Sequence, residues 1–133
     1  MGNCEEAFTF YKSVFGGEFP YVGRYDEMPE NPKHPISDED KRKIMHISLP
    51  ISKETVLMGS DTGVHGPPNS IVGNNISISA GASSKEEANR IFSRLSDSGK
   101  ITRPIADMFW GDYFGSCTDK FNINWMVVYG GNP

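Results

Sequence analysis

The chain has 133 residues and a mass of 14.7 kDa, which is the size of one ordinary domain with its own hydrophobic core. Its formal net charge is -4 and lysine and arginine do not cluster, so the basic surface that nucleic-acid binding requires is missing. No apolar run is long enough to cross a bilayer, and no N-terminal signal pattern is visible. We therefore expect a soluble, cytoplasmic protein that binds neither nucleic acid nor membrane.

The two cysteines do not form a recognisable redox or zinc motif. Cys4 and Cys117 lie far apart in the sequence and match no CxxC spacing. We expect them to be free, buried thiols, with a disulfide as the less favoured alternative.

The first half of the chain begins with a helix. Apolar residues recur at helical spacing from Asn3 to Phe15, Asn3 is a plausible N-cap, and Gly16 and Gly17 end the pattern. Three strands are expected to follow, in "EFPYVGRYDE", "IMHISLPI" and "ETVLMGSD". The segment "MPENPKHPISDEDKRK", with three prolines and mixed charges, reads as an exposed loop.

The second half begins with a strand and then a helix. In "NNISISAG", the polar residues Asn75, Ser77 and Ser79 alternate with Ile76, Ile78 and Ala80, which predicts a strand whose apolar side packs under a helix. That helix is expected from Ser84 to Leu95, with Ser83 or Ser84 as its cap. Further strands are predicted in "KITRPIADMF", "GDYFGSCTD" and "INWMVVY".

The order of these elements indicates an internal duplication. The second half reads β-α-β-β-β, and the first half reads α-β-β-β, which is the same unit without its leading strand. We therefore predict an α+β fold of two βαβββ modules within one domain: residues 1–63, a linker at 64–73, and residues 74–133. Each module would curve a small sheet around a cavity, with its helix outside.

Two stretches carry a resemblance to a known family. "NCEEAFTFYKSVFGGE" and "ADMFWGDYFGSCTDKFNINWMVVY" resemble the PhnB-like branch of the vicinal oxygen chelate superfamily, which includes glyoxalase I, extradiol dioxygenases and bleomycin-resistance proteins. The resemblance covers nearly the whole chain. It implies two modules that begin with a strand, and this chain begins directly at the helix cap.

The resemblance also implies where a metal would be bound in a chelating relative. The leading-strand position of the second module falls on Asn75, and the last-strand glutamate position falls on Met126. Neither residue is a good ligand for a divalent transition metal, because a carboxamide oxygen binds weakly and a thioether prefers soft copper. We therefore predict no metal and no cofactor.

The cavity itself is predicted from strand alternation. Asn75, Ser77 and Ser79 would line it from one strand, and Asn124, Met126 and Val128 from the last strand, while Trp125 and Val127 face the helix. His46, a possible general base or ligand, is more often a structural histidine at such a position. Trp110 and Tyr113 would either stack on a flat ligand or fill core and subunit contacts.

Three functions follow from these residues and the resemblance. The preferred one is a metal-free cavity that binds or sequesters a small molecule in the manner of bleomycin-resistance proteins. A metal-dependent lyase, isomerase or dioxygenase needs at least three ligands, of which only His46 is a candidate. A methyltransferase, a label attached to the PhnB-like branch, would need a Gly-rich cofactor loop that the sequence does not contain.

A homodimer is expected as well. Each curved module leaves sheet edges and an aromatic-rich surface that a single domain covers poorly. The superfamily commonly completes its cavities across two subunits, so we expect "FWGDYFG" near the cavity mouth or the subunit contact.

Overall fold

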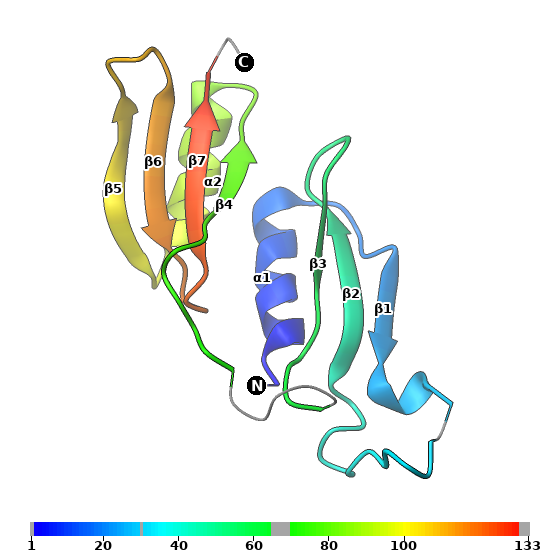
Figure 1. The fold of residues 1–133 in the computed structure, drawn as a ribbon. Coiled ribbons are helices and arrows are strands. Elements are labelled where there is room, and N and C mark those ends of the chain that lie inside the picture. Colours follow the sequence, from blue (N-terminus) through cyan, green and yellow to red (C-terminus); the bar gives the residue numbers. More distant parts are fainter. Residues whose placement is uncertain (1, 30, 65–69, 131–133) are drawn as a thin grey trace. The chain divides into compact units, whose positions relative to one another are not determined.

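The computed structural model describes residues 2–29, 31–64 and 70–130. The chain divides into two compact units, Met1–Ile71 and Val72–Pro133. No helix among the described residues is both long enough and apolar enough to cross a membrane. Figure 1 shows the helices and strands of each unit.

The first unit contains a helix and an antiparallel sheet. Its elements are α1 (Cys4–Phe15), β1 (Tyr21–Arg24), the short 3-10 helix η1 (Tyr25–Glu27), β2 (Ile44–Pro50) and β3 (Val56–Gly59), and the sheet order is β1-β2-β3. Helix α1 packs against β2, and Val14, Ile47 and Leu49 are almost completely buried. Three strands and one helix therefore form this core.

The second unit contains the complete version of the same arrangement. Its elements are β4 (Ile78–Gly81), α2 (Lys85–Ser96), β5 (Lys100–Asp107), β6 (Tyr113–Thr118) and β7 (Asn124–Tyr129), with sheet order β4-β7-β6-β5. Strand β4 runs parallel to β7, and the other neighbours are antiparallel. The α+β fold of two related modules, the first without a leading strand, is confirmed. In the second sheet, β4 pairs with the outer side of β7. The corresponding strand of the first sheet is β3, which is an edge strand among the described residues.

A phenylalanine of each helix approaches a glycine of its sheet. A Cβ atom at Gly59 would lie 2.5 Å from Cε1 of Phe8, and one at Gly115 would lie 2.9 Å from Cε1 of Phe92. A larger residue at Gly59 would push α1 away from the sheet, and one at Gly115 would press on Ile105 of β5 as well as on α2, because close-packed cores absorb added volume poorly. These glycines allow each helix to cover one face of its sheet closely.

The start of α1 is held differently from the prediction. Asn3 occupies the predicted N-cap position, but its side chain makes no capping hydrogen bond. Instead, Cys4 donates its backbone N–H to Oδ1 of the buried Asp61 at 2.9 Å, and Ile44 donates its own to Oδ2 at 2.8 Å. One carboxylate thus joins the start of α1 and the start of β2 to the chain just after β3. At the second helix, Ser84 is the cap as predicted and accepts from the N–H of Glu87.

Strand β4 is shorter than the sequence pattern predicted. It begins at Ile78, and Ile76 is 76% exposed, so the expectation that Ile76 packs under the helix is wrong. Its pairing partner β7 begins at Asn124, after a turn in which Asn122 has a φ of 68°. Residues before Ser77 therefore have no strand beside them with which to pair. From Ile78 onward the predicted alternation is present, with Ala80 buried and Ser79 exposed.

Replacing the buried carboxylate of the first unit should lower stability strongly. Asp61→Ala leaves the N–H groups of Cys4 and Ile44 buried without acceptors, and each such group costs about 1–3 kcal/mol. We expect the free energy of unfolding, measured by urea denaturation, to fall by about 2–4 kcal/mol. The control Asp38→Ala removes an exposed carboxylate and should change it by less than about 0.5 kcal/mol. Equal effects of the two substitutions would contradict this role of Asp61.

Candidate functional site

The face of the second sheet opposite α2, which we call the open face, carries a row of side chains across all four strands. Ser79 on β4 lies beside Met126 on β7, and Met126 lies beside Ser116 on β6. The hydroxyl of Ser116 is 2.7 Å from that of Thr102 on β5. On the other face, Trp125, Val127 and their neighbours are buried. The open face thus carries hydroxyl groups around one thioether, and Arg103 on β5 is the register partner of Ser116.

An aromatic group borders this row. Phe114 pairs with Val128 in the next register position of the open face. The ring of Trp110 lies 6.1 Å from that of Phe114 in an edge-to-face arrangement, and its Nε1 donates to Oδ2 of Asp112 at 3.0 Å. Trp110 is 51% exposed, so the indole is oriented by Asp112 while much of its surface remains accessible.

A second polar pair lies at the other end of the row. The hydroxyl of Thr118 donates to Oδ1 of Asn124 at 2.9 Å, and Nδ2 of Asn124 donates to the carbonyl of Ile76 at 3.2 Å. Asn75 and Ser77 are exposed in the segment leading into β4. The structure therefore places Ser79, Asn124 and Met126 on one face, with Ser77 and Asn75 in the chain that leads to it.

Tyr113 lies away from this group. Its hydroxyl donates to Oδ1 of Asn89 on α2 at 2.5 Å, and the ammonium of Lys85 lies 5.0 Å from its ring centre. Both partners belong to the helix, so Tyr113 is on the opposite face of the sheet from Met126. Adjacent residues of a strand point to opposite faces, and Tyr113 precedes Phe114. The structure does not bring Tyr113 together with the other predicted site residues of this unit.

His46 belongs to the first unit. It pairs with Gly23 on β1, and its ring centre lies 5.7 Å from that of Tyr21. Tyr21, Ser48 and Met58 form a row across β1, β2 and β3 on the face that α1 does not cover. His46 is partly exposed, and an aromatic neighbour accounts for its position without a ligand.

Three open-face residues were missing from the predicted pocket. They are Thr102 on β5 and Phe114 and Ser116 on β6. The alternation in "YFGSCT" is the signal that would have found Phe114 and Ser116, once Gly115 and Cys117 were assigned to the buried face. Thr102 gives no such signal, because the pairing of β5 with β6 is irregular on both sides of Arg103.

The residues do not fit a divalent transition metal. Among the described ranges, no group of three or more His, Cys, Asp or Glu side chains is arranged to hold one. Asn75 and Met126, at the positions that the resemblance assigns to ligands, offer a carboxamide and a thioether, which are poor ligands for zinc or iron. The two buried carboxylates already accept other hydrogen bonds. Asp61 accepts from two backbone N–H groups, and Asp119 accepts from Phe121, Ile123 and the indole of Trp125.

Both cysteines are free and buried, as predicted. Burial, with a further contribution from the charge of Asp61, raises the pKa of the Cys4 thiol to about 12. Burial, together with the charge of Asp119, raises the pKa of the Cys117 thiol to about 11. The nucleophilic form of a cysteine is the thiolate, so neither residue is prepared for nucleophilic catalysis.

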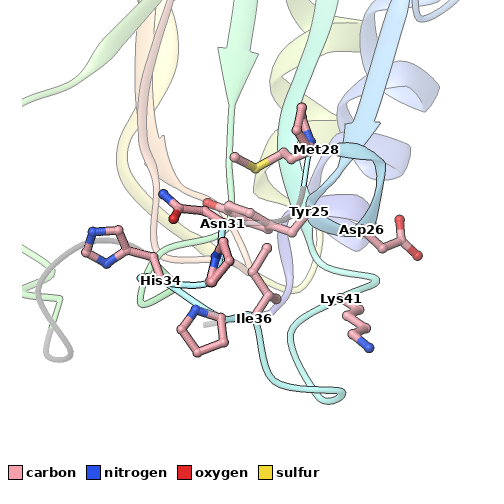
Figure 2. A pocket seen from close by; sticks show the side chains of 10 residues that line it. Tyr25, Asp26, Met28, Asn31, His34, Ile36 and Lys41 are labelled. Carbon is pink, nitrogen blue, oxygen red and sulfur yellow. The ribbon is translucent and has the colours of Figure 1, made fainter.

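A pocket of about 480 Å³ lies elsewhere in the first unit, within the loop between β1 and β2. Figure 2 shows Tyr25 in it, with Met28 and Ile36 on either side of the ring and Asn31 and His34 toward one end. None of the predicted site residues lines this pocket. The open face, by contrast, gathers residues from all four strands of its sheet, and we treat it as the principal site.

Comparison with known proteins identifies the family of this chain. The model of the Glyoxalase/Bleomycin resistance protein/Dioxygenase superfamily matches residues 1–127, and the chain belongs to this superfamily. Protein YjdN of Escherichia coli is 26% identical over 132 residues, which cover 95% of this chain and 87% of YjdN.

Solved structures agree with this assignment. The protein PA1353 from Pseudomonas aeruginosa has a TM-score of 0.81 and 34% identity, over 98% of this chain and 92% of that one. A PhnB protein from Bacillus cereus, which carries the label of a 3-demethylubiquinone-9 3-methyltransferase, has a TM-score of 0.72 and 24% identity, over 97% and 92%. The second likeness concerns the fold alone.

The raised pKa values of the thiols predict slow chemical modification. At pH 8, iodoacetamide should leave Cys4 and Cys117 unmodified in the folded protein for hours and alkylate both within minutes in denaturant, as counted by mass spectrometry. Because folding raises both pKa values above about 9, the stability contributed by the protonated thiols is complete below pH 9. It is lost as the pH rises toward 11 and 12. Rapid alkylation of either thiol in the native state would contradict the burial described here.

Proposed function

We propose that the protein binds a small organic molecule on the open face of the second sheet and sequesters it without a metal ion or cofactor. The observation that carries this proposal is the row of Ser79, Met126, Ser116 and Thr102, bordered by the ring of Phe114. An apolar surface with a few placed polar groups is the usual lining of a small-molecule site. A flat ligand would rest on Met126 and Phe114 and exchange hydrogen bonds with the hydroxyl groups.

The side chains on the open face favour binding over turnover. Hydroxyl, carboxamide and thioether groups do not titrate near neutral pH. A serine becomes a useful nucleophile only when a base lies within hydrogen-bond reach, and the Ser116 hydroxyl contacts another hydroxyl, that of Thr102. These hydroxyl, carboxamide and thioether groups can orient a ligand, but none of them is an acid or a base for a reaction.

Two enzyme functions remain as alternatives. The superfamily takes part of its name from dioxygenases and glyoxalases, so a metal-dependent lyase, isomerase or dioxygenase is the first. The label of the Bacillus cereus relative supplies the second, a methyltransferase. The donor set described above argues against the first, and the second requires a site for S-adenosylmethionine. Both can be separated from simple binding in one experiment.

Tryptophan fluorescence offers a direct test, because Trp125 is fully buried and Trp110 is half exposed. We expect 2-naphthol, a flat uncharged probe, to quench the emission saturably, and Trp110→Phe to remove most of the quenching. Ser79→Phe places a ring on the open face and should weaken binding at least about tenfold. The matched control Ser93→Phe adds the same ring to an exposed position of α2 and should leave binding unchanged.

The same titration separates the alternatives. Binding that is unchanged by EDTA and by S-adenosylmethionine supports metal-free sequestration. Loss of binding after EDTA, restored by zinc, nickel or iron, would replace the proposal with the metal-dependent enzyme. Saturable binding of S-adenosylmethionine would support the methyltransferase. Equal binding by the Ser79→Phe and Ser93→Phe variants would remove the open face as the site.

We further propose that the protein acts as a homodimer through the turn between β5 and β6. Phe109 is 96% exposed there, and its ring centre lies 4.9 Å from that of the half-exposed Trp110. Two neighbouring exposed aromatic rings are typical of the centre of a subunit contact. The contact would bury more than roughly 1,000 Å² in total.

Light scattering after size-exclusion chromatography tests the dimer. At micromolar concentration we expect a mass of twice 14.7 kDa for the unmodified chain. Phe109→Asp should shift the protein to a single chain, because a carboxylate in the contact would be desolvated. Ile123→Asp, in the turn between β6 and β7, is the control and should leave the dimer intact. A stable monomer of the unmodified protein would disprove the proposal.

A further inference from the structure

The loop between β1 and β2 is closed at its base by backbone hydrogen bonds. Tyr25 donates its N–H to the carbonyl of Lys43 at 3.1 Å, and Asp26 donates its own to the carbonyl of Lys41 at 2.9 Å. The chain from residue 26 to residue 41 therefore leaves and re-enters the sheet at one point. Compact loops with adjacent ends frequently carry binding functions. We call the described residues of this segment, 26–29 and 31–41, the 26–41 loop.

The 26–41 loop encloses the pocket described above. Its volume of about 480 Å³ falls within the usual range for small-molecule sites. Met28, Ile36 and three prolines, Pro29, Pro32 and Pro35, provide most of the apolar wall. Proline has no N–H to donate and a fixed φ. The walls of the pocket therefore present apolar surface with few backbone N–H donors. The prolines also restrict the unfolded chain, so less conformational entropy is lost when the loop becomes ordered.

Tyr25 fixes the inner end of the pocket. Only 8% of this residue is exposed, and its hydroxyl donates to the carbonyl of Asp61 at 3.3 Å. The hydroxyl group of Tyr25 therefore anchors the ring to the chain that follows β3. In Figure 2 the ring lies between Met28 and Ile36, where a planar ligand would contact it.

The two charged side chains of the pocket already have partners of opposite sign. Asp26 pairs with Arg42 at 3.1 Å, and Lys41 pairs with Asp38 at 2.8 Å. A charged ligand would gain little from groups that are already paired with an opposite charge. The pocket therefore favours a neutral ligand.

The side chain of Asn31 indicates which polar group a ligand of this pocket would carry. Its Oδ1 accepts the N–H of Lys33 at 3.0 Å, so the carboxamide oxygen is engaged within the loop. The amide nitrogen of the same side chain is left to donate. Figure 2 shows Asn31 and His34 on one side of Tyr25, with Asp26 and Lys41 on the other. A carbonyl oxygen on the ligand is the complementary acceptor.

We propose that the 26–41 loop forms a second binding site, separate from the open face, for a neutral ring-containing molecule with a carbonyl acceptor. The ring of the ligand lies against Tyr25 and contacts Met28 and Ile36, and its carbonyl accepts from the amide nitrogen of Asn31. All of these residues belong to the first unit, so the site does not depend on the proposed function of the second sheet.

Three probes of the same shape test the charge preference. Benzamide is neutral and carries a carbonyl, benzoate is anionic, and benzamidine is cationic. Titrations followed by NMR should give saturable shifts of the Met28 and Ile36 methyl groups with benzamide, with a Kd on the order of 1 mM for so small a molecule. We expect benzoate and benzamidine to bind at least about fivefold more weakly.

Substitutions within the loop test the contacts. Asn31→Asp keeps an oxygen to accept from Lys33 but removes the donor, and should weaken benzamide binding about tenfold. Ile36→Asp should abolish it. The matched control Ile71→Asp, at a 94% exposed position of the same unit, should not affect it. No saturable shift with benzamide, stronger binding of a charged probe, or equal effects of Ile36→Asp and Ile71→Asp would overturn the proposal.

Discussion

Successive side chains of a strand point to opposite faces, so the helix packed on each sheet covers only one of them. In the second unit the covered face holds Trp125 and Val127, and the open face is left to Ser79, Met126 and Ser116. The face under the helix must be apolar because it forms the core. The open face is not subject to this requirement. Polar and apolar groups can therefore be combined on the open face without cost to the core. The same division occurs in the first unit, where Ile47 faces the core and Tyr21, Ser48 and Met58 form the other row.

Two buried aspartates hold the ends of these elements. Asp61 accepts from the first N–H of α1 and from the start of β2, and it places a negative charge at the positive end of the helix. Asp119 accepts from the turn before β7 and from the indole of Trp125, and so links that turn to the largest buried side chain. Neither carboxylate remains available as a ligand or a base. The same two charges help to keep the cysteines protonated, because both Asp61 and Asp119 disfavour a nearby thiolate.

The sequence was sufficient for those features that depend on local periodicity. Both helices, the missing leading strand and the alternation in β7 were predicted, because apolar spacing determines which residues face a core. Features that depend on distant partners were not. The start of β4 is determined by where β7 begins, the cap of α1 comes from Asp61, and the contact between Thr102 and Ser116 crosses an irregular pairing. The loop from residue 26 to 41 was expected only as an exposed connection, because the backbone bonds that close it leave no pattern in the residues.

The two sheets also differ in how their strands are connected, and this difference bears on the order of folding. In the first unit β1, β2 and β3 are neighbours both in the sequence and in the sheet, so each pairing closes a loop between consecutive strands. In the second unit β4 and β7 are the first and last elements, and their parallel pairing of Ile78 with Trp125 closes a loop that contains α2, β5 and β6. Contacts between distant parts of a chain cost more loop-closure entropy and form more slowly. The open face is complete only when β4 joins β7, so we expect the four-stranded surface of the second unit to form late in folding.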